Sequence, residues 1–322
     1  MICGYVFRPG EPARPITPDE ATRALRSDRA QGEFFWLHFS LANSATERWF
    51  RAFDNLPKTF LAGLRAPSNA TRVEQDDDAL VALINDVLFD FTYESSAVST
   101  ATLVVRPEFM ISTRMRPLTS IDRLRETVKA GAICRSPVEL LARLLQNQAD
   151  VLVDIVRRSA EKVDKIEDSV LSNRIATFRV ELSALRRVLV RLERLLAPEP
   201  AALFRLLSRP PGWIVEMDLQ ALRQAAEEFT AVVADCTALV ERAKLIQEEL
   251  GALATEQTNR SLFILTFVTV LLLPFNVVGG LFGMNVGGIP YANDAHGFWV
   301  IILLVCVLTA GVGYFVLRRF RQ

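Results

Sequence analysis

The sequence predicts an α+β soluble domain, followed by a long helical stalk and two C-terminal transmembrane helices. Charge is segregated along the chain, since Asp294 is the only formally charged side chain between Ser261 and Leu317. Two apolar runs, 261–282 and 298–317, each have roughly the 20 residues that a helix needs to cross a bilayer. Ahead of the first run, apolar residues recur at alternating spacings of three and four, which indicates long helices packed side by side.

Composition excludes several classes of protein. The 322 residues include 37 Lys and Arg and 37 Asp and Glu, and this balance argues against a nucleic-acid-binding protein. The four cysteines are widely scattered, so they predict neither a disulfide framework nor a structural zinc site. The first ten residues, MICGYVFRPG, lack the apolar core of a signal peptide. We therefore expect the soluble part to be cytoplasmic.

Residues 1–131 are predicted to form a cytoplasmic α/β domain. Strands are expected at 34–39, 79–84, 102–105 and 109–113, and the last two form a hairpin around Arg106-Pro107-Glu108. Short helices are expected at 18–29, 45–53 and 120–130. Asp76-Asp77-Asp78 has two interpretations, a charged hairpin turn or a group that attracts metal ions.

Residues 132–212 are predicted to form a helical arm. Ser136 followed by Pro137 is a typical helix start, with an N-cap residue and a proline in the first turn. Helical periodicity continues to about residue 170, and a second leucine-rich helix is expected at 174–196. The proline-containing stretches 197–200 and 209–212 interrupt the helical pattern.

Residues 213–260 are predicted to be a stalk helix that continues into the first apolar run. At 1.5 Å per residue, a helix from Met217 to Phe282 would be on the order of 100 Å long; several shorter, kinked helices are the alternative. The acids Glu241, Glu248, Glu249 and Glu256 either line an inner vestibule or only solvate a helix face. The heptad seam of this helix consists of Phe229, Val232, Cys236, Leu239, Ala243, Ile246, Leu250 and Leu253.

The two membrane spans are predicted at 261–283 and 298–317, with a loop at 284–297 and a basic tail at 318–322. The loop has no Lys or Arg, whereas Arg260 precedes the first span and Arg318, Arg319 and Arg321 follow the second. The positive-inside rule therefore places both termini in the cytoplasm and the loop outside. A buried helical hairpin of a soluble protein is the alternative.

One face of the first span differs from the others, because it carries polar and small residues. Such residues are unfavourable in a membrane unless they face a partner or a water-filled path. Two interpretations remain open: helix association through Gly279-x-x-x-Gly283, or a pore that several copies of the chain enclose. This polar stripe contains Asn259, Leu262, Thr266, Thr269, Leu273, Asn276, Gly280 and Gly283.

Gly283-Met284-Asn285 follows a proline-containing first span in a C-terminal two-span hairpin, and in this position it resembles the CorA superfamily of divalent-cation transporters. The resemblance covers the whole chain, and Asn259, Pro274 and Asn276 stand where that family has an asparagine, a proline and a small polar pore residue. The following Gly287-Gly288-Ile289-Pro290 resembles the ZntB zinc-transport branch. The acidic, proline-containing continuation of the magnesium branch is absent.

The resemblance implies a CorA-like homopentameric funnel in the bacterial inner membrane, with the first span lining the pore. It implies transport of Zn²⁺ or other divalent cations, linked to protons in this branch, with the ion as substrate and no cofactor. A ring of Asn285 side chains would hold a hydrated ion through its waters; alternatively, Asn285 only caps the helix. Leu262 and Leu273 would form apolar constrictions or simply pack.

Two loop residues are further candidates. Asp294 would make the outer mouth of the pore negative. His296 is either a proton-sensing group or a solvated histidine. The sequence contains no phosphate-binding glycine loop and no nucleophile–base pair, so we expect no enzyme. The rival functions are a Mg²⁺ or Co²⁺ channel of the same superfamily and a membrane-anchored coiled-coil scaffold, for which the polar stripe would have no use.

Overall fold

The computed structural model describes residues 1–25, 32–51, 53, 56–65, 71–88, 98–170, 175–284 and 296–319. Contacts divide the chain into two compact units, Met1–Gln247 and Glu248–Gln322. The boundary falls within one long helix.

The first unit is built on a seven-stranded mixed sheet of order β2-β1-β3-β7-β6-β5-β4. Strands β3 and β7 are parallel, with Trp36 opposite Met110, and the other neighbours are antiparallel. The predicted hairpin is confirmed, because β6 pairs with β7 through Arg106 and Phe109. The edge strands β2 and β4 were not predicted, nor was β1, which lies between β2 and β3. The strands are β1 Cys3–Phe7, β2 Arg14–Pro15, β3 Phe34–Ser40, β4 Arg72–Asp76, β5 Ala79–Val87, β6 Val98–Arg106 and β7 Phe109–Arg114.

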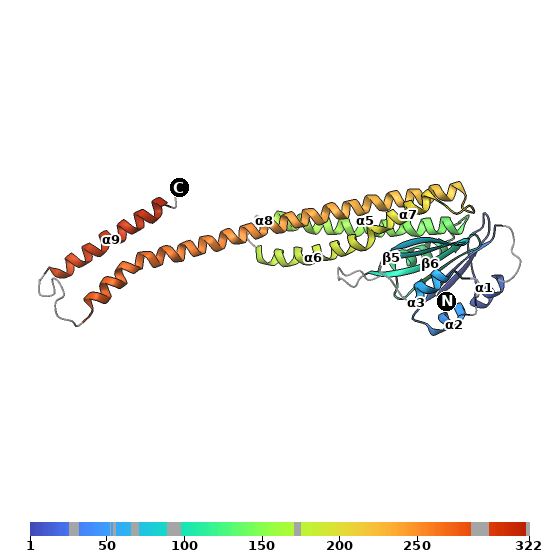
Figure 1. The fold of residues 1–322 in the computed structure, drawn as a ribbon, viewed down its shortest axis with the longest axis horizontal. Helices are drawn as coiled ribbons and strands as arrows, with labels where there is room; N and C mark the ends of the chain where they lie inside the picture. The colour runs from blue at the N-terminus through green and yellow to red at the C-terminus, as the bar shows by residue number, and fades with distance from the viewer. Residues whose placement is uncertain are drawn as a thin grey trace. The chain divides into compact units, whose positions relative to one another are not determined.

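Both faces of the sheet are buried (Figure 1). Side chains alternate between the two faces along each strand, so that Phe35 and Leu37 contact one cluster while Phe34 and Trp36 contact the other. The first face is covered by α1 Pro18–Ala24, α2 Ser44–Arg51 and α3 Lys58–Arg65. The second is covered by α4 Thr119–Lys129 and by parts of three later helices, α5 Pro137–Val170, α7 Pro198–Ser208 and α8 Glu216–Phe282. α1 and α2 are shorter than predicted, and α3 was not predicted.

The acidic segment at 76–78 is a hairpin turn between β4 and β5, as one of its two interpretations predicted. Asp76 pairs with Ala79, and Asp77 takes a positive φ of 53°. The Asp76 carboxylate accepts hydrogen bonds from Thr59 N at 3.2 Å and Thr59 Oγ1 at 2.6 Å. Asp76 therefore satisfies a free N–H in the first turn of α3.

Four long helices follow the sheet: α5 Pro137–Val170, α6 Ile175–Leu196, α8 Glu216–Phe282 and α9 Gly297–Arg319. A shorter helix, α7 Pro198–Ser208, lies between α6 and α8. The prolines at 198 and 200 therefore end one helix and begin the next, since proline is tolerated in a first turn. The predicted uninterrupted helix is confirmed, because α8 continues through Pro274.

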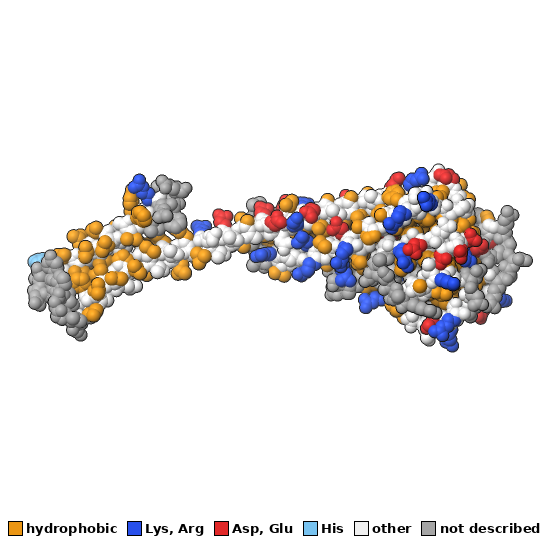
Figure 2. All heavy atoms as spheres, viewed as in Figure 1, with side chains coloured by type: hydrophobic (Ala, Val, Ile, Leu, Met, Phe, Trp, Pro, Cys, Tyr) orange, Lys and Arg blue, Asp and Glu red, His pale blue; other side chains and the backbone are white. Residues whose placement is uncertain are grey.

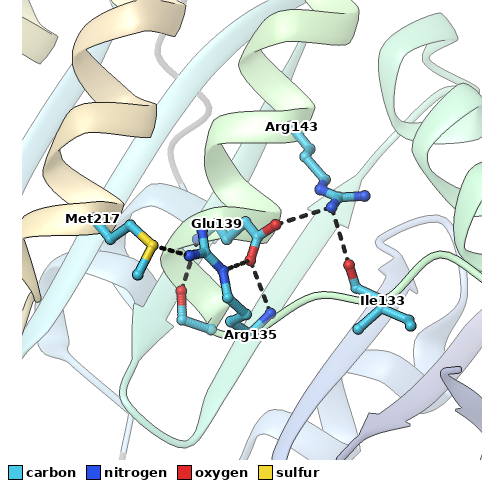
Figure 3. Close-up of polar contacts among 6 residues, drawn as sticks. Ile133, Arg135, Glu139, Arg143 and Met217 are labelled. Carbon is cyan, nitrogen blue, oxygen red and sulfur yellow. Dashed lines mark hydrogen bonds and ion pairs between the residues drawn. The ribbon is translucent and has the colours of Figure 1, made fainter. Parts of the chain in front are cut away.

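A small polar cluster fixes the start of α5 (Figure 3). Ser136 is the predicted N-cap, and its Oγ accepts a hydrogen bond from Glu139 N at 2.9 Å. The Glu139 carboxylate accepts from Arg135 N at 2.8 Å and from Arg143 at 2.9 Å. Arg135 also donates to the sulfur of Met217 near the start of α8. The cluster thus joins the beginnings of two long helices.

The predicted seam packs α8 onto α5 and α6. Its residues are buried from Phe229 to Leu250, and Leu253 is half-buried. Phe229 and Val232 share a cluster with Ile155 of α5 and Leu192 of α6. Beside the seam, Arg242 forms ion pairs with Asp164 and Glu167 of α5. Helix packing therefore holds the part of α8 that lies within the first unit.

Candidate functional site

The second unit contains two apolar helices, the C-terminal part of α8 and α9. Both contain a segment long and apolar enough to cross a membrane. Its surface in Figure 2 is largely apolar, whereas Lys, Arg, Asp and Glu side chains gather on the first unit. Two such apolar helices at the C-terminus agree with the predicted fold class.

One side of α8 in this unit faces α9. The Cδ2 atom of Leu271 lies 3.4 Å from the position that a Cβ on Gly313 would take, and Val305 of α9 is buried. At about 100° per residue, the half-buried positions of α8 share this side of the helix. These positions are Phe263, Phe267, Val270, Leu271, Pro274, Val278 and Phe282.

The predicted polar stripe lies on the opposite side of α8. All of its residues from Asn259 to Gly283 are exposed, including Leu262 at 55% and Leu273 at 59%. Neither α9 nor any other described residue buries this side. Polar side chains within a membrane-spanning helix are costly unless they face a partner or water, and no described residue of this chain covers them.

The stripe offers oxygen atoms that accept hydrogen bonds. Thr269 donates its hydroxyl hydrogen to the Leu265 carbonyl at 2.9 Å, so its Oγ1 lone pairs remain available outward. Asn259 and Asn276 add side-chain amides, which carry both an acceptor and donors. The stripe has no carboxylate, thiol or imidazole. Such a surface suits contact with the water shell of a cation better than direct coordination of a bare ion.

Glycines end α8 at the predicted motif. Gly283 N donates to the Gly279 carbonyl at 2.9 Å, and a Cβ on Gly283 would lie only 2.8 Å from that carbonyl oxygen. A side chain at 283 would therefore force the helix end to shift. Cβ atoms on Gly279 and Gly280 would meet no described atom within 4 Å. Contacts within the described chain therefore do not require these two glycines.

The remaining predicted site residues lie around the loop. Met284 is exposed, directly after α8. His296 is exposed, and its carbonyl accepts from Val300 N at 3.2 Å in the first turn of α9. Asn285 and Asp294 lie outside the described residues, so the structure does not place the amide ring or the acidic mouth.

Other polar candidates stay apart from one another. Glu241, Glu248, Glu249 and Glu256 of α8 are exposed. The described residues contain no group of three His, Cys, Asp or Glu side chains able to hold a metal ion. The cysteines Cys3, Cys134, Cys236 and Cys306 are free thiols.

The sequence profile of a family described as CorA-like Mg²⁺ transporter protein matches residues 31–319. The chain belongs to the CorA family. Two relatives illustrate its range. The divalent cation transporter CmaX of Pseudomonas aeruginosa is 30% identical over 331 residues, covering 100% of this chain and 96% of the relative. The zinc transport protein ZntB of Pectobacterium carotovorum is 24% identical over 283 residues, covering 88% of this chain and 86% of the relative.

Solved structures agree with this membership. The full-length CmaX structure superposes with a TM-score of 0.82 at 26% identity, covering 100% of this chain and 98% of the other. The CorA magnesium transporter of Methanocaldococcus jannaschii gives a TM-score of 0.77 over the same shares of the two chains. Its 16% identity makes this a likeness of fold alone.

The predicted CorA resemblance and fold class are thereby confirmed, and this CorA family chain is a divalent-cation transporter. The sequence predicted the polar stripe of α8, but it did not predict that α9 packs on the opposite side of this helix. The half-buried positions are apolar like most of this part of α8, so their periodicity does not distinguish the side that faces α9.

Proposed function

We propose that copies of this chain assemble as a homopentamer around a pore that carries hydrated divalent cations, with Zn²⁺ as the substrate. The polar stripe supports this most directly, because it is uncovered on the side of α8 opposite α9. A single stripe encloses no water in a monomer, so a pore requires neighbouring copies. Gly279 and Gly280 would let the helix ends approach closely in such an assembly.

Within this pore, Asn285 would form the selectivity ring together with Gly283 and Met284. Amide oxygens bind a hydrated cation through its waters without removing them, and a divalent ion loses its waters reluctantly. Below the ring, Asn276, Thr269, Thr266 and Asn259 would pass the ion along by water-mediated contacts. Each of these described side chains is exposed on the same side of α8.

Leu273 and Leu262 would be the points where the pore closes. Each is an exposed apolar side chain between polar stripe positions. Copies brought around a common axis would form apolar rings, and such rings close a pore by losing their water. In this arrangement the polar positions carry the ion and the leucine positions interrupt the water column.

We place the protein in the bacterial inner membrane with both termini in the cytoplasm. The basic residues Arg260, Arg318, Arg319 and Arg321 flank the spans on that side, and the loop 284–297 contains none. Asp294 would then attract cations to the outer mouth. His296 would lie on the same side, where a proton gradient would reach it.

The proposal of Zn²⁺ as the substrate rests on the ZntB-like loop sequence and on relatives such as the ZntB of Pectobacterium carotovorum. Mg²⁺ is the second candidate, because the matching family profile is described as a Mg²⁺ transporter. A pore that contacts only hydration water separates these ions weakly, so flux has to be compared directly.

The test is uptake of Zn²⁺, Mg²⁺, Co²⁺ and Ni²⁺ into liposomes that contain the purified protein, with and without a pH gradient. We expect Zn²⁺ uptake well above that of empty vesicles, and a loss of selectivity or of flux in Asn285→Ala. Uptake at the level of empty vesicles would contradict a transporter. Undiminished and equally selective flux in Asn285→Ala would remove Asn285 from the ring. The mass of the detergent-solubilised particle checks the pentamer.

A further inference from the structure

A fully buried carboxyl group lies within the first unit, in the first turn of α7. Glu199 has no exposed surface. Its Oε2 accepts a hydrogen bond from Gln148 Nε2 of α5 at 3.2 Å. Its Oε1 has no hydrogen-bond partner within the described chain. A glutamate in a first helical turn is normally exposed, where it benefits from the helix dipole, so its burial here needs an explanation.

Gln148 connects this carboxyl group to the sheet. Its Nε2 also donates to the backbone carbonyl of Asn85 in β5 at 2.6 Å, and Gln148 is itself buried. The Gln148 Oε1 atom is buried without a partner among the described residues. One amide thus joins α5, α7 and β5, and two side-chain oxygens at this junction lack a donor.

The charge that acts on Glu199 is negative. Asp86 of β5 is buried, and its carboxylate accepts from Val87 N at 2.8 Å and from Ser120 N and Oγ at 3.1 and 2.7 Å. Asp122 of α4 acts on Asp86 and is balanced by its own ion pairs with Arg114 and Arg125. No ion pair reaches Glu199 within the described part of the chain.

A buried carboxylate without a positive partner costs several kcal/mol and normally takes up a proton instead. Burial, reinforced by the charge of Asp86, raises the pKa of Glu199 well above its ordinary value, although Gln148 opposes the rise. Burial likewise raises the pKa of Asp86 to about 6. Protonation removes the charge of Glu199 and gives the junction an O–H donor that it otherwise lacks.

We propose that Glu199 and Gln148 form a buried proton-binding site that holds α7 against α5 and the sheet. With the proton bound, the junction is neutral and α7 is docked. Proton release places a negative charge beside Asp86 and weakens the docking. The inference rests on contacts within the first unit and does not depend on the proposed pore.

The direction of the pH dependence follows from the raised pKa. The pKa of a glutamate in an unfolded chain is about 4.3. The stabilisation by the bound proton is therefore complete below that pH, and it is lost as the pH rises through the pKa of the folded state. Docking of α7 should weaken towards alkaline pH.

The experiment is hydrogen–deuterium exchange of the full chain in detergent at pH 6 and pH 9, corrected for the intrinsic effect of pH. We expect protection of residues 198–208 to fall at least about tenfold at pH 9 in the wild type. Glu199→Gln keeps the shape of the side chain but cannot ionise, so its protection should be the same at both pH values. Glu227→Gln, at an exposed position of α8, is the matched control and should behave like the wild type.

Two results would overturn the proposal: wild-type protection that does not change with pH, or a fall of equal size in Glu199→Gln. If Glu199→Gln does not fold, infrared spectra of the wild type decide. We expect a carboxylic-acid carbonyl band at pH 6 that disappears towards pH 9. In Asp86→Asn the band should disappear at lower pH than in the wild type, because the negative charge of Asp86, which raises the pKa of Glu199, has been removed; a wild type without this band at pH 6 contradicts the site.

Discussion

At the scale of single residues, the polar stripe of α8 is informative because no described element of the chain packs against it. Asn276 and Thr269 lie on a helix side that α9 does not reach, although both are polar residues within a membrane span. The sequence identified this stripe correctly because helical periodicity fixes which side chains share a face. It could not show which face the second span covers, since both helices are apolar over most of their surface.

The buried polar residues of the first unit were harder to predict. Glu199 was interpreted as part of a proline-rich break, and His38 as part of an aromatic strand. Both are fully buried, and their surroundings come from segments distant in sequence, such as Ser112 for His38 and Gln148 for Glu199. Periodicity assigns a residue to a face but does not reveal these partners.

His38 predicts a loss of stability in acid. Its Nδ1 shares a hydrogen bond of 2.8 Å with Ser112 Oγ, which also accepts from Trp36. Burial, together with the nearby charge of Arg114, lowers the pKa of His38 to about 3. The stabilisation by the neutral ring is therefore present above about pH 6.5 and is lost as the pH falls towards 3.

We expect the free energy of unfolding of the wild type to fall between pH 6.5 and 4.5, with His38 contributing about 1.4 kcal/mol per pH unit. His38→Asn keeps a hydrogen-bonding group but does not titrate, so its fall should be smaller by that amount. Denaturant unfolding of the full chain at several pH values measures the difference. Equal pH dependence in the two proteins would show that the ring is not held neutral.

At the scale of elements, α8 was the most predictable part of the chain and the edge strands were the least. The seam of α8 recurs over many turns, and its residues are buried as a heptad pattern requires. By contrast, β4 Arg72–Asp76 is short, charged and only partly buried, so it has no apolar alternation to detect. β2 has two residues and exists because β1 pairs with it.

Two substitutions in α8 test what holds the helix to α5 and α6. Phe229 is fully buried in the seam, so Phe229→Ala should lower the free energy of unfolding by about 3–5 kcal/mol. Arg242 makes two ion pairs, but its side chain is 45% exposed, so Arg242→Ala should lose at most about 1 kcal/mol. Denaturant unfolding of the full chain measures both. A larger loss for Arg242→Ala than for Phe229→Ala would mean that charge, not packing, holds the helices.

At the scale of the whole molecule, the proposed pore needs more than one copy of the chain. Its family membership and fold were predictable, because the charge segregation, the two spans and Gly283-Met284-Asn285 occur together in one order along the sequence. The proposed assembly was inferred only through the family resemblance, since one chain would provide only one side of a pore. The account therefore depends on whether the polar stripe of α8 faces water.

The most direct measurement of that point is thiol accessibility in the reconstituted protein. Cys306 is exposed on α9 and is first replaced, as Cys306→Ser. In this background Thr269→Cys and Asn276→Cys are compared with Phe275→Cys, which is exposed on another side of the same helix. A water-soluble, positively charged thiol reagent is added, and labelling and Zn²⁺ uptake are followed together.

The account predicts that the reagent labels Thr269→Cys and Asn276→Cys and blocks their uptake of Zn²⁺, while Phe275→Cys stays unlabelled among the lipid tails. The contradicting result is that both stripe variants resist the reagent as Phe275→Cys does and transport at their original rate. The stripe would then be a dry contact surface between helices.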